Sequence, residues 1–202
     1  DCGNHQNHKT GFPRNQVVGE QVPLLAEVLA LKNQYPDLAI EWNVEIKYAD
    51  ILGLHPREVV VEKVLAAIEE YGELDKTTIF SFDVEVLRRV KKLMPRQRIN
   101  FLYEAKSLLV PLEQWLDVDI RIPDWRHCRQ IVDELGAEVF SPYYRFIELF
   151  PGWKRYFPVG KRDCELYVWT VNSPRSWRRL LGQVDAIITD EPTKLREWLK
   201  HS

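Results

Sequence analysis

The sequence has few of the residues that mark a disulfide-rich or membrane-spanning protein. Its three cysteines, Cys2, Cys128 and Cys164, are odd in number and widely scattered, which argues against a disulfide framework. No apolar run approaches the roughly 18 residues that a membrane-spanning helix needs, and no basic-then-apolar start indicates a signal peptide. The chain also lacks an initiator methionine, so we expect translation to begin upstream of Asp1.

The net charge of the chain is also close to zero. The 28 Lys and Arg residues against 30 Asp and Glu give a formal charge of −2, which offers no electrostatic reason to expect binding to nucleic acid. With 202 residues and 45% hydrophobic content, the chain can form one sizeable core. We therefore predict a single domain over residues 1–202, with residues 1–20 as loop. The sequence decides neither the oligomeric state nor whether the protein is cytoplasmic or exported.

Predicted strands and helices alternate along the chain. The strands are predicted at residues 39–47, 77–82, 99–103, 138–144, 164–172 and 184–190, and the helices at residues 23–35, 56–71, 84–94, 125–135, 174–181 and from 192 onward. This rhythm of about thirty residues per unit is typical of a parallel α/β sheet. A full (β/α)₈ barrel has eight units in about 250 residues. The pattern predicts about six βα units of a TIM barrel that is incomplete at its N-terminal side.

Two charged residues close the first predicted strand. Glu45 and Lys47 are two residues apart in "NVEIK", and residues two apart in a strand share a face. A charge that faces a core is costly unless it is paired, solvated or bound to metal. Because catalytic residues of (β/α) barrels lie at the carboxyl ends of the strands, the pair is a candidate site. A partly buried structural ion pair is the alternative.

Five motifs in order resemble the glycerophosphodiester phosphodiesterases. "NVEIK" (43–47) is similar to the internal strand motif of that family, and "VWTVNSPRSWRRLLGQVDAIITDEP" (168–192) is similar to its C-terminal signature. The segments "GEQVPLLAEVL" (19–29), "IFSFDVEVLRRVKKLMP" (79–95) and "GAEVFSPYY" (136–144) fit the same order. The resemblance covers nearly the whole chain from about residue 10.

This resemblance implies a TIM barrel of the phospholipase C-like type that cleaves glycerophosphodiesters to glycerol 3-phosphate and an alcohol. It implies a divalent cation, Ca²⁺ or Mg²⁺, with Glu45 as a metal ligand and Lys47 as the cation that faces the phosphate. It also places Trp169 as an apolar wall beside the glycerol or head group, although a tryptophan at a strand end is often simply core. Tyr143 is a further candidate at the same mouth, and the aromatic-rich loop 145–163 is expected to cover the pocket.

The sequence departs from the family at its beginning. Before "NVEIK" it contains neither the His-Arg-Gly motif nor the Glu-x-Asp strand pair, which in the family supply acid/base histidines and further metal carboxylates. We therefore expect the chain to begin after about a quarter of a barrel and to be inactive alone. The alternative is a catalytically dead barrel fragment that acts as a binding or scaffolding domain. A different metal-dependent barrel hydrolase is a third possibility.

Three other patterns have simpler explanations. Cys2, His5 and His8 are spaced like metal ligands, but a fourth partner is missing. The basic cluster is predicted to be a solvated outer helix face; it comprises Arg88, Arg89, Lys91, Lys92, Arg96 and Arg98. Asp190 is expected to cap the last helix through an Asp-x-Pro turn.

Overall fold

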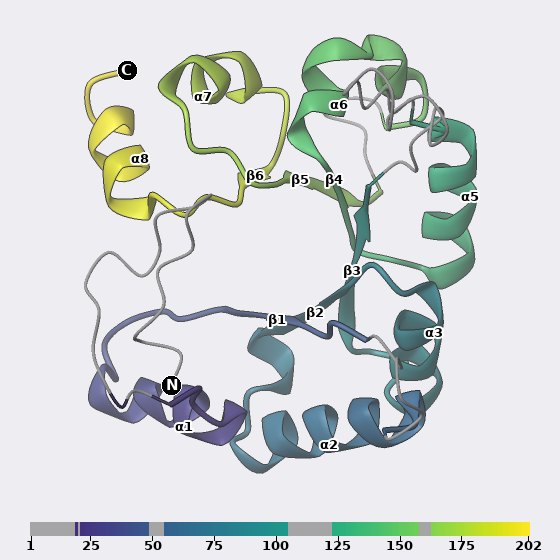
Figure 1. The fold of residues 1–202 in the computed structure, drawn as a ribbon, viewed down its shortest axis with the longest axis vertical. Coiled ribbons are helices and arrows are strands. Elements are labelled where there is room, and N and C mark those ends of the chain that lie inside the picture. The colour runs from purple at the N-terminus through teal and green to yellow at the C-terminus, as the bar shows by residue number, and fades with distance from the viewer. Residues whose placement is uncertain (1–18, 20, 49–54, 105–122, 158–162) are drawn as a thin grey trace.

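The computed structural model is built around one curved sheet of six parallel strands (Figure 1). It describes residues 19, 21–48, 55–104, 123–157 and 163–202. The strands are β1 (Trp42–Glu45), β2 (Thr77–Ser81), β3 (Arg98–Tyr103), β4 (Val139–Pro142), β5 (Glu165–Val168) and β6 (Ala186–Ile187). Each strand pairs with its neighbour in the sequence, in the order β1-β2-β3-β4-β5-β6. The predicted run of six βα units is confirmed.

Helices cover the outer, convex side of the sheet (Figure 1). They are α1 (Leu25–Ala30), η1 (Leu31–Gln34), α2 (Arg57–Glu70), η2 (Leu74–Lys76), α3 (Val84–Leu93), α5 (Trp125–Leu135), α6 (Tyr144–Leu149), η3 (Pro151–Arg155), α7 (Pro174–Leu180) and α8 (Pro192–Leu199). Three of the predicted helix starts have side-chain caps. Asp83, Asp124 and Ser173 accept hydrogen bonds from backbone N–H groups in the first turns of α3, α5 and α7, which satisfies donors that the helix leaves free.

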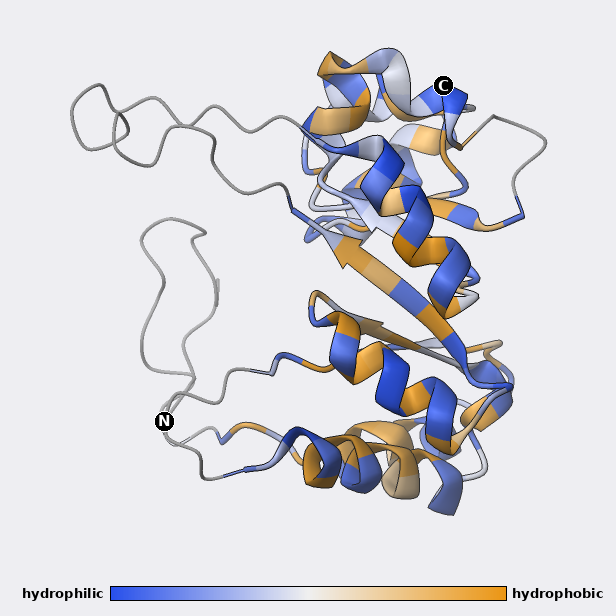
Figure 2. Ribbon diagram, turned by 90° about the vertical axis from the view of Figure 1, so that its right-hand side faces the viewer, coloured by the Kyte–Doolittle hydropathy of each residue, from blue (hydrophilic) through white to orange (hydrophobic). Residues whose placement is uncertain are grey.

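The two faces of the sheet have different chemistry. Ile79, Ile99 and Leu166 are fully buried and belong to the core that packs against the helices, and Figure 2 shows the alternation of polar and apolar residues along these helices. The inner face is more polar. Arg98 on β3 forms an ion pair with Glu165 on β5 at 2.7 Å. Because these strands are separated by β4, the two side chains must lie on the same face of the sheet.

A buried carboxylate anchors the first helical segment to the sheet. Glu73 is only 1% exposed, and its side chain forms an ion pair with Lys32 of η1. It also accepts a hydrogen bond of 2.9 Å from Nε1 of Trp42 on β1. A buried charge is tolerated when it is paired and hydrogen-bonded, so this cluster stabilises the contact between η1 and β1.

Two predictions made on local structure are wrong. The segment 145–163 is not an irregular loop, because α6 and η3 occupy its first half and Trp153 and Phe157 are buried there. Residues 158–162 lie outside the described residues. Glu191 is the N-cap residue of α8, and its side chain makes no capping hydrogen bond. The carboxylate of Asp190 accepts a hydrogen bond of 2.8 Å from Nδ2 of Asn172. Asp190 therefore does not cap α8.

Candidate active site

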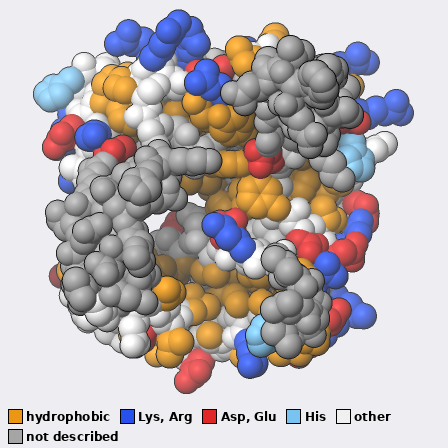
Figure 3. Space-filling model, viewed as in Figure 1, with side chains coloured by type: hydrophobic (Ala, Val, Ile, Leu, Met, Phe, Trp, Pro, Cys, Tyr) orange, Lys and Arg blue, Asp and Glu red, His pale blue; other side chains and the backbone are white. Residues whose placement is uncertain are grey.

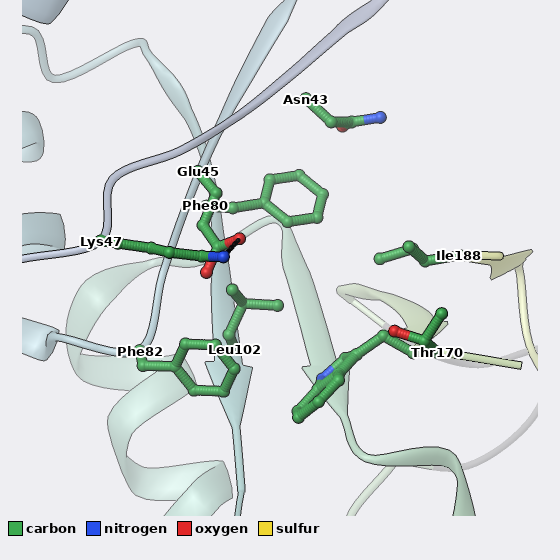
Figure 4. Close-up of a pocket in the computed structure, with 9 residues that line it drawn as sticks. Asn43, Glu45, Lys47, Phe80, Phe82, Leu102, Thr170 and Ile188 are labelled. Atoms are coloured by element: carbon green, nitrogen blue, oxygen red, sulfur yellow. Dashed lines mark ion pairs between the residues drawn. The ribbon is translucent and has the colours of Figure 1, made fainter. Parts of the chain in front are cut away.

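A pocket of about 390 Å³ lies at the carboxyl ends of the strands. Figure 3 shows the hollow in the middle of this face, with hydrophobic side chains on its walls, and Figure 4 shows how the side chains converge on it. Among the described residues, nine line it: Asn43, Glu45, Lys47, Phe80, Phe82, Leu102, Trp169, Thr170 and Ile188. Residues at the start of the sheet and at its end therefore form a single cavity, at the position where barrel proteins bind ligands.

The backbone of β1 explains why Glu45 and Lys47 share a side. Ile46 lies between them, is 4% exposed, and donates its N–H to the Phe80 carbonyl at 2.8 Å. The Ser81 hydroxyl donates to the Ile46 carbonyl, also at 2.8 Å. With Ile46 held in this way, the residues before and after it both line the pocket, as the alternation of side chains along a strand requires.

The two charges form an exposed ion pair. Lys47 Nζ lies 3.5 Å from Glu45 Oε2, and the two side chains are 79% and 31% exposed. Ion pairs this exposed contribute about 0–1 kcal/mol to stability. The ion pair therefore contributes little to the stability of the fold. Both charged groups remain accessible to a ligand in the pocket.

Trp169 lies in the wall of the pocket, and its orientation is fixed from behind. Its Nε1 donates a hydrogen bond of 2.9 Å to the Ser141 carbonyl. The Ser141 hydroxyl in turn accepts a hydrogen bond of 2.7 Å from Nδ2 of the fully buried Asn100. A buried polar chain across β3, β4 and the end of β5 thus holds the indole in place.

Tyr143 is placed differently from Trp169. Its ring centroid lies 5.5 Å from that of Trp169, but Tyr143 is not among the described residues that line the pocket. Burial raises the pKa of the Tyr143 phenol, as expected for a group that packs against other rings. The structure therefore places Tyr143 next to Trp169, and a direct contact of Tyr143 with substrate stays a prediction.

Sequence reasoning missed most of the apolar part of the pocket. Phe80, Phe82 and Leu102 line it, and none of them was predicted as a site residue. Ser81 and Ser141 are polar residues near the same strand ends, but they are buried and hydrogen-bonded within the protein. The available signal was the spacing itself, because Phe80 and Phe82 are two residues apart at the end of a predicted strand.

A second pocket of about 410 Å³ adjoins the same ion pair. It is lined by Glu45, Ile46, Lys47, Tyr48, Ser81, Phe82 and Asp83. Arg57 lies close to it, because its guanidinium contacts Asp83 Oδ2 at 2.9 Å and is 4.7 Å from the centroid of the Tyr48 ring. Glu45, Lys47 and Phe82 line both pockets.

The described residues do not complete a divalent cation site. Ca²⁺ and Mg²⁺ require several oxygen ligands, and within the part of the chain that the structure describes no three His, Cys, Asp or Glu side chains gather around one point. Glu45 is the single carboxylate among the described residues in the wall of the larger pocket. It supplies at most one residue of a ligand set, so a metal ion at this pocket would need further ligands from other residues.

The remaining sequence candidates are resolved in part. Cys2, His5 and His8 lie outside the described residues. Several members of the basic cluster have acidic partners on neighbouring elements: Arg88 with Glu134, Arg89 with Glu62, Lys91 with Glu138 and Arg98 with Glu165. Arg98 belongs to β3 and does not lie on an outer helix face, which corrects that prediction.

Within the described ranges, every helix is too short or too polar to span a membrane.

A curved parallel sheet with a pocket at its carboxyl edge defines a barrel-type α/β protein. The model of the glycerophosphoryl diester phosphodiesterase family matches residues 4–194. The chain belongs to this family, which confirms the resemblance found in its motifs. A curated glycerophosphodiester phosphodiesterase from Caldanaerobacter subterraneus is 32% identical over 180 residues, which cover 88% of this chain and 61% of the relative. The chain thus spans about three fifths of that relative's length.

Solved structures show the same architecture. A crystal structure from Silicibacter pomeroyi, named as a glycerophosphoryl diester phosphodiesterase, aligns with a TM-score of 0.69 and 26% identity, covering 92% of this chain and 59% of the other. An Oleispira antarctica phosphodiesterase in complex with the product sn-glycerol 3-phosphate aligns with a TM-score of 0.64 and 17% identity, covering 88% and 61%. The second likeness shows the fold alone.

Proposed function

We propose that the protein to which this chain belongs hydrolyses glycerophosphodiesters to glycerol 3-phosphate and an alcohol, within glycerophospholipid turnover. The observation that carries the proposal is the convergence of Glu45 and Lys47 on one aromatic-walled pocket in a chain of this family. The activity named for the Caldanaerobacter relative and the product bound to the Oleispira phosphodiesterase support it. Both are properties of those proteins.

In this proposal Lys47 binds the phosphodiester anion. Its ammonium group is mostly exposed in the pocket and carries three N–H donors that can reach phosphoryl oxygens. Positive charge next to the phosphoryl group stabilises the negative charge that spreads over these oxygens in the transition state. Trp169 and its apolar neighbours would cover the carbon atoms of the substrate and keep water away from them.

Glu45 is proposed as one ligand of a Ca²⁺ or Mg²⁺ ion. Carboxylate oxygens suit such hard cations, and a metal ion would neutralise charge on the phosphate. The other ligands, and the acid and base that move protons, are proposed to come from residues outside this chain, since residues 1–42 contain neither a His-Arg-Gly motif nor a Glu-x-Asp pair.

The test is an assay of the full natural gene product on glycerophosphodiesters, with added Ca²⁺ or Mg²⁺ and with a chelator. Release of glycerol 3-phosphate is measured for the wild type, Glu45→Gln and Lys47→Met. We expect each variant to lose about 100-fold or more in kcat/KM, the range seen when one charge-stabilising group is removed. Glu41→Gln, an exposed carboxylate beside the same strand, is the matched control and should keep its rate.

Failure of the wild type to cleave any glycerophosphodiester with either ion would overturn the proposal. Unchanged rates in both variants would remove Glu45 and Lys47 from the mechanism. A binding or scaffolding role is the second candidate, and it is favoured by the incomplete ligand set among the described residues. An intact mass near 23.9 kDa for the protein from its natural source would support that role over catalysis.

A further inference from the structure

The outer surface of α7 carries three arginine side chains without acidic partners. Arg175, Arg178 and Arg179 are exposed, and within the described ranges none of them forms an ion pair. Figure 3 shows Lys and Arg side chains gathered over α7 at the top of the molecule. Leu181 follows the helix directly and is 53% exposed. These four residues are here called the α7 face, a local concentration of positive charge on a chain whose net charge is only −2.

Packing fixes the direction in which the α7 face points. Trp177 and Leu180 are 2% and 0% exposed, and the indole N–H of Trp177 donates a hydrogen bond of 2.8 Å to the Val171 carbonyl. The ring of Trp198 on α8 packs against the same indole, with the centroids 5.8 Å apart. Leu181 continues the helical path, because its N–H donates to the Trp177 carbonyl at 2.9 Å. With its apolar side held inward in this way, α7 turns its arginines toward solvent.

Arginines on other outer helices are neutralised by ion pairs. Arg88 of α3 pairs with Glu134 of α5. Arg89 of α3 pairs with Glu62 of α2. Arg129 of α5 contacts two aspartates, one on its own helix and one beyond it. The arginines of α7 depart from this arrangement, so their charge is not used in contacts between neighbouring elements of the described fold.

Helix electrostatics explain only part of the charge on α7. Arg178 and Arg179 lie in the last turn, where a cation interacts favourably with the helix macrodipole. Arg175 lies in the first turn, where the macrodipole disfavours a cation. The exposed side chain of Leu181 gains nothing from the macrodipole and is unfavourable in water. A partner outside the chain therefore accounts for the α7 face better than the fold does.

The chemistry of the α7 face matches an anionic phospholipid surface. Guanidinium groups bind phosphate oxygens through paired N–H donors, and basic residues near an anionic membrane are attracted to it. Leu181 can enter the boundary between head groups and acyl chains, while the apolar stems of the arginines lie along it. The face belongs to the outer, convex layer of helices (Figure 1). A convex layer suits contact with a broad lipid surface.

We infer that the α7 face docks the protein reversibly on the surface of an anionic phospholipid membrane. The helix connects the carboxyl end of β5 with the amino end of β6, so its last turn lies at the edge of the sheet opposite the pocket. Docking through Arg178, Arg179 and Leu181 therefore leaves the pocket open to water. The inference goes beyond the proposed function and does not depend on it, because it concerns a different surface.

The experiment measures flotation of the full natural gene product with vesicles of phosphatidylcholine alone, or of equal parts phosphatidylcholine and phosphatidylglycerol. The wild type should float with the anionic vesicles only, and added salt should release it. Arg178→Gln combined with Arg179→Gln should weaken the partition roughly thirtyfold, because each basic residue contributes about fivefold at such a surface. The matched control, Arg88→Gln combined with Arg89→Gln, removes the same two charges from α3 and should bind as the wild type does.

A wild type that floats with neither kind of vesicle, or with both equally, would overturn the inference. An unchanged partition in the α7 variant would do the same. So would an equal loss in the α3 variant, because binding would then follow the net charge of the protein.

A second variant separates a membrane from an acidic protein partner. Leu181→Ser retains every arginine and should weaken binding to the anionic vesicles roughly tenfold, since an apolar side chain no longer enters the lipid. Unchanged binding in this variant would indicate a purely electrostatic contact, as with an acidic protein, and would refute membrane docking. Thermal unfolding of each variant checks that its fold is intact.

Discussion

At the scale of single residues, Cys128 is fully buried and sits beside Tyr103. Burial raises the pKa of the Cys128 thiol from its usual value near 9 to about 12, and burial also raises the pKa of the Tyr103 phenol to about 12. Both groups are neutral in the folded protein over most of the alkaline range. The unfolded chain loses these protons at lower pH, so folding becomes linked to proton binding.

This linkage predicts an alkaline loss of stability. Between about pH 9 and 12 the unfolded chain has released the Cys128 proton while the folded chain retains it, so the free energy of unfolding falls as the pH rises. One such proton changes it by about 1.4 kcal/mol per pH unit. Urea unfolding between about pH 8 and 11 should show a shallower slope for Cys128→Ala than for the wild type. Equal slopes would contradict the prediction, and data near pH 7, where the thiol does not titrate, serve as the control.

The sequence identified the charged residues of the site better than the aromatic ones. Glu45 and Lys47 stood out because charged residues at the end of an apolar strand are unusual, and their two-residue spacing is visible in the sequence. For Phe82 the spacing from Phe80 was the one available signal, and it is weak because an aromatic residue in an apolar run is most simply core. Its exposure depends on the curvature of the sheet and on the packing of Trp169, which comes from a distant segment of the chain.

At the scale of the elements, Asp83 connects three parts of the structure. Its carboxylate accepts hydrogen bonds from the Glu85 and Val86 N–H groups at 2.8 and 3.3 Å, which caps α3. It also accepts a hydrogen bond of 3.0 Å from Nε of Arg57 at the start of α2. One side chain thus holds the first turns of two adjacent helices next to the end of β2.

Replacement of Asp83 should separate its two roles. Asp83→Ala removes the cap, for about 0.5–2 kcal/mol, and the ion pair with Arg57, for up to about 1 kcal/mol more. Asp83→Asn retains a good cap but loses the charge, so we expect it to destabilise less than Asp83→Ala. The measurement is the midpoint of urea unfolding. If the two variants lost equal stability, the charge and not the cap would be the main contribution.

Elements were predictable wherever they had a long pattern or a capping residue. The six strands and the helices α3, α5 and α7 appeared near their predicted positions because short apolar runs and helical spacing of apolar residues are local signals. The short helix α6 and the turn η3 did not, since six residues are too few to show a helical period among so many aromatics. Asp190 was misassigned because its partner, Asn172, is distant in sequence and the local Asp-x-Pro pattern was equally consistent with a cap.

At the scale of the whole molecule, the sheet has two ends. Among the described residues β1 pairs only with β2 and β6 only with β5, so each has one unpaired edge within the described part of the fold. Large apolar side chains are also exposed near these ends: Val22, Leu24, Tyr35 and Leu38 around α1, and Leu181 and Leu199 around α7 and α8. Unpaired edges and exposed apolar surface favour association with other chains.

We therefore predict that the 202-residue chain self-associates when it is produced alone. Sedimentation velocity over a series of protein concentrations should show species heavier than the monomer, with a fraction that grows with concentration. The full natural gene product, measured in the same buffer, is the comparison and should associate less. A 202-residue chain that stays monomeric at every concentration would contradict the prediction.

The sequential order of the strands has a consequence for the timing of pocket assembly. Glu45, Lys47 and Phe82 belong to units that leave the ribosome earlier than those of Trp169, Thr170 and Ile188. The cavity that all six line can exist only after the final units have joined the sheet. A ligand that bridges these early and late segments would stabilise the completed fold, by about 2.7 kcal/mol at a concentration one hundred times its Kd. A ligand of this pocket would thus act as a late folding aid.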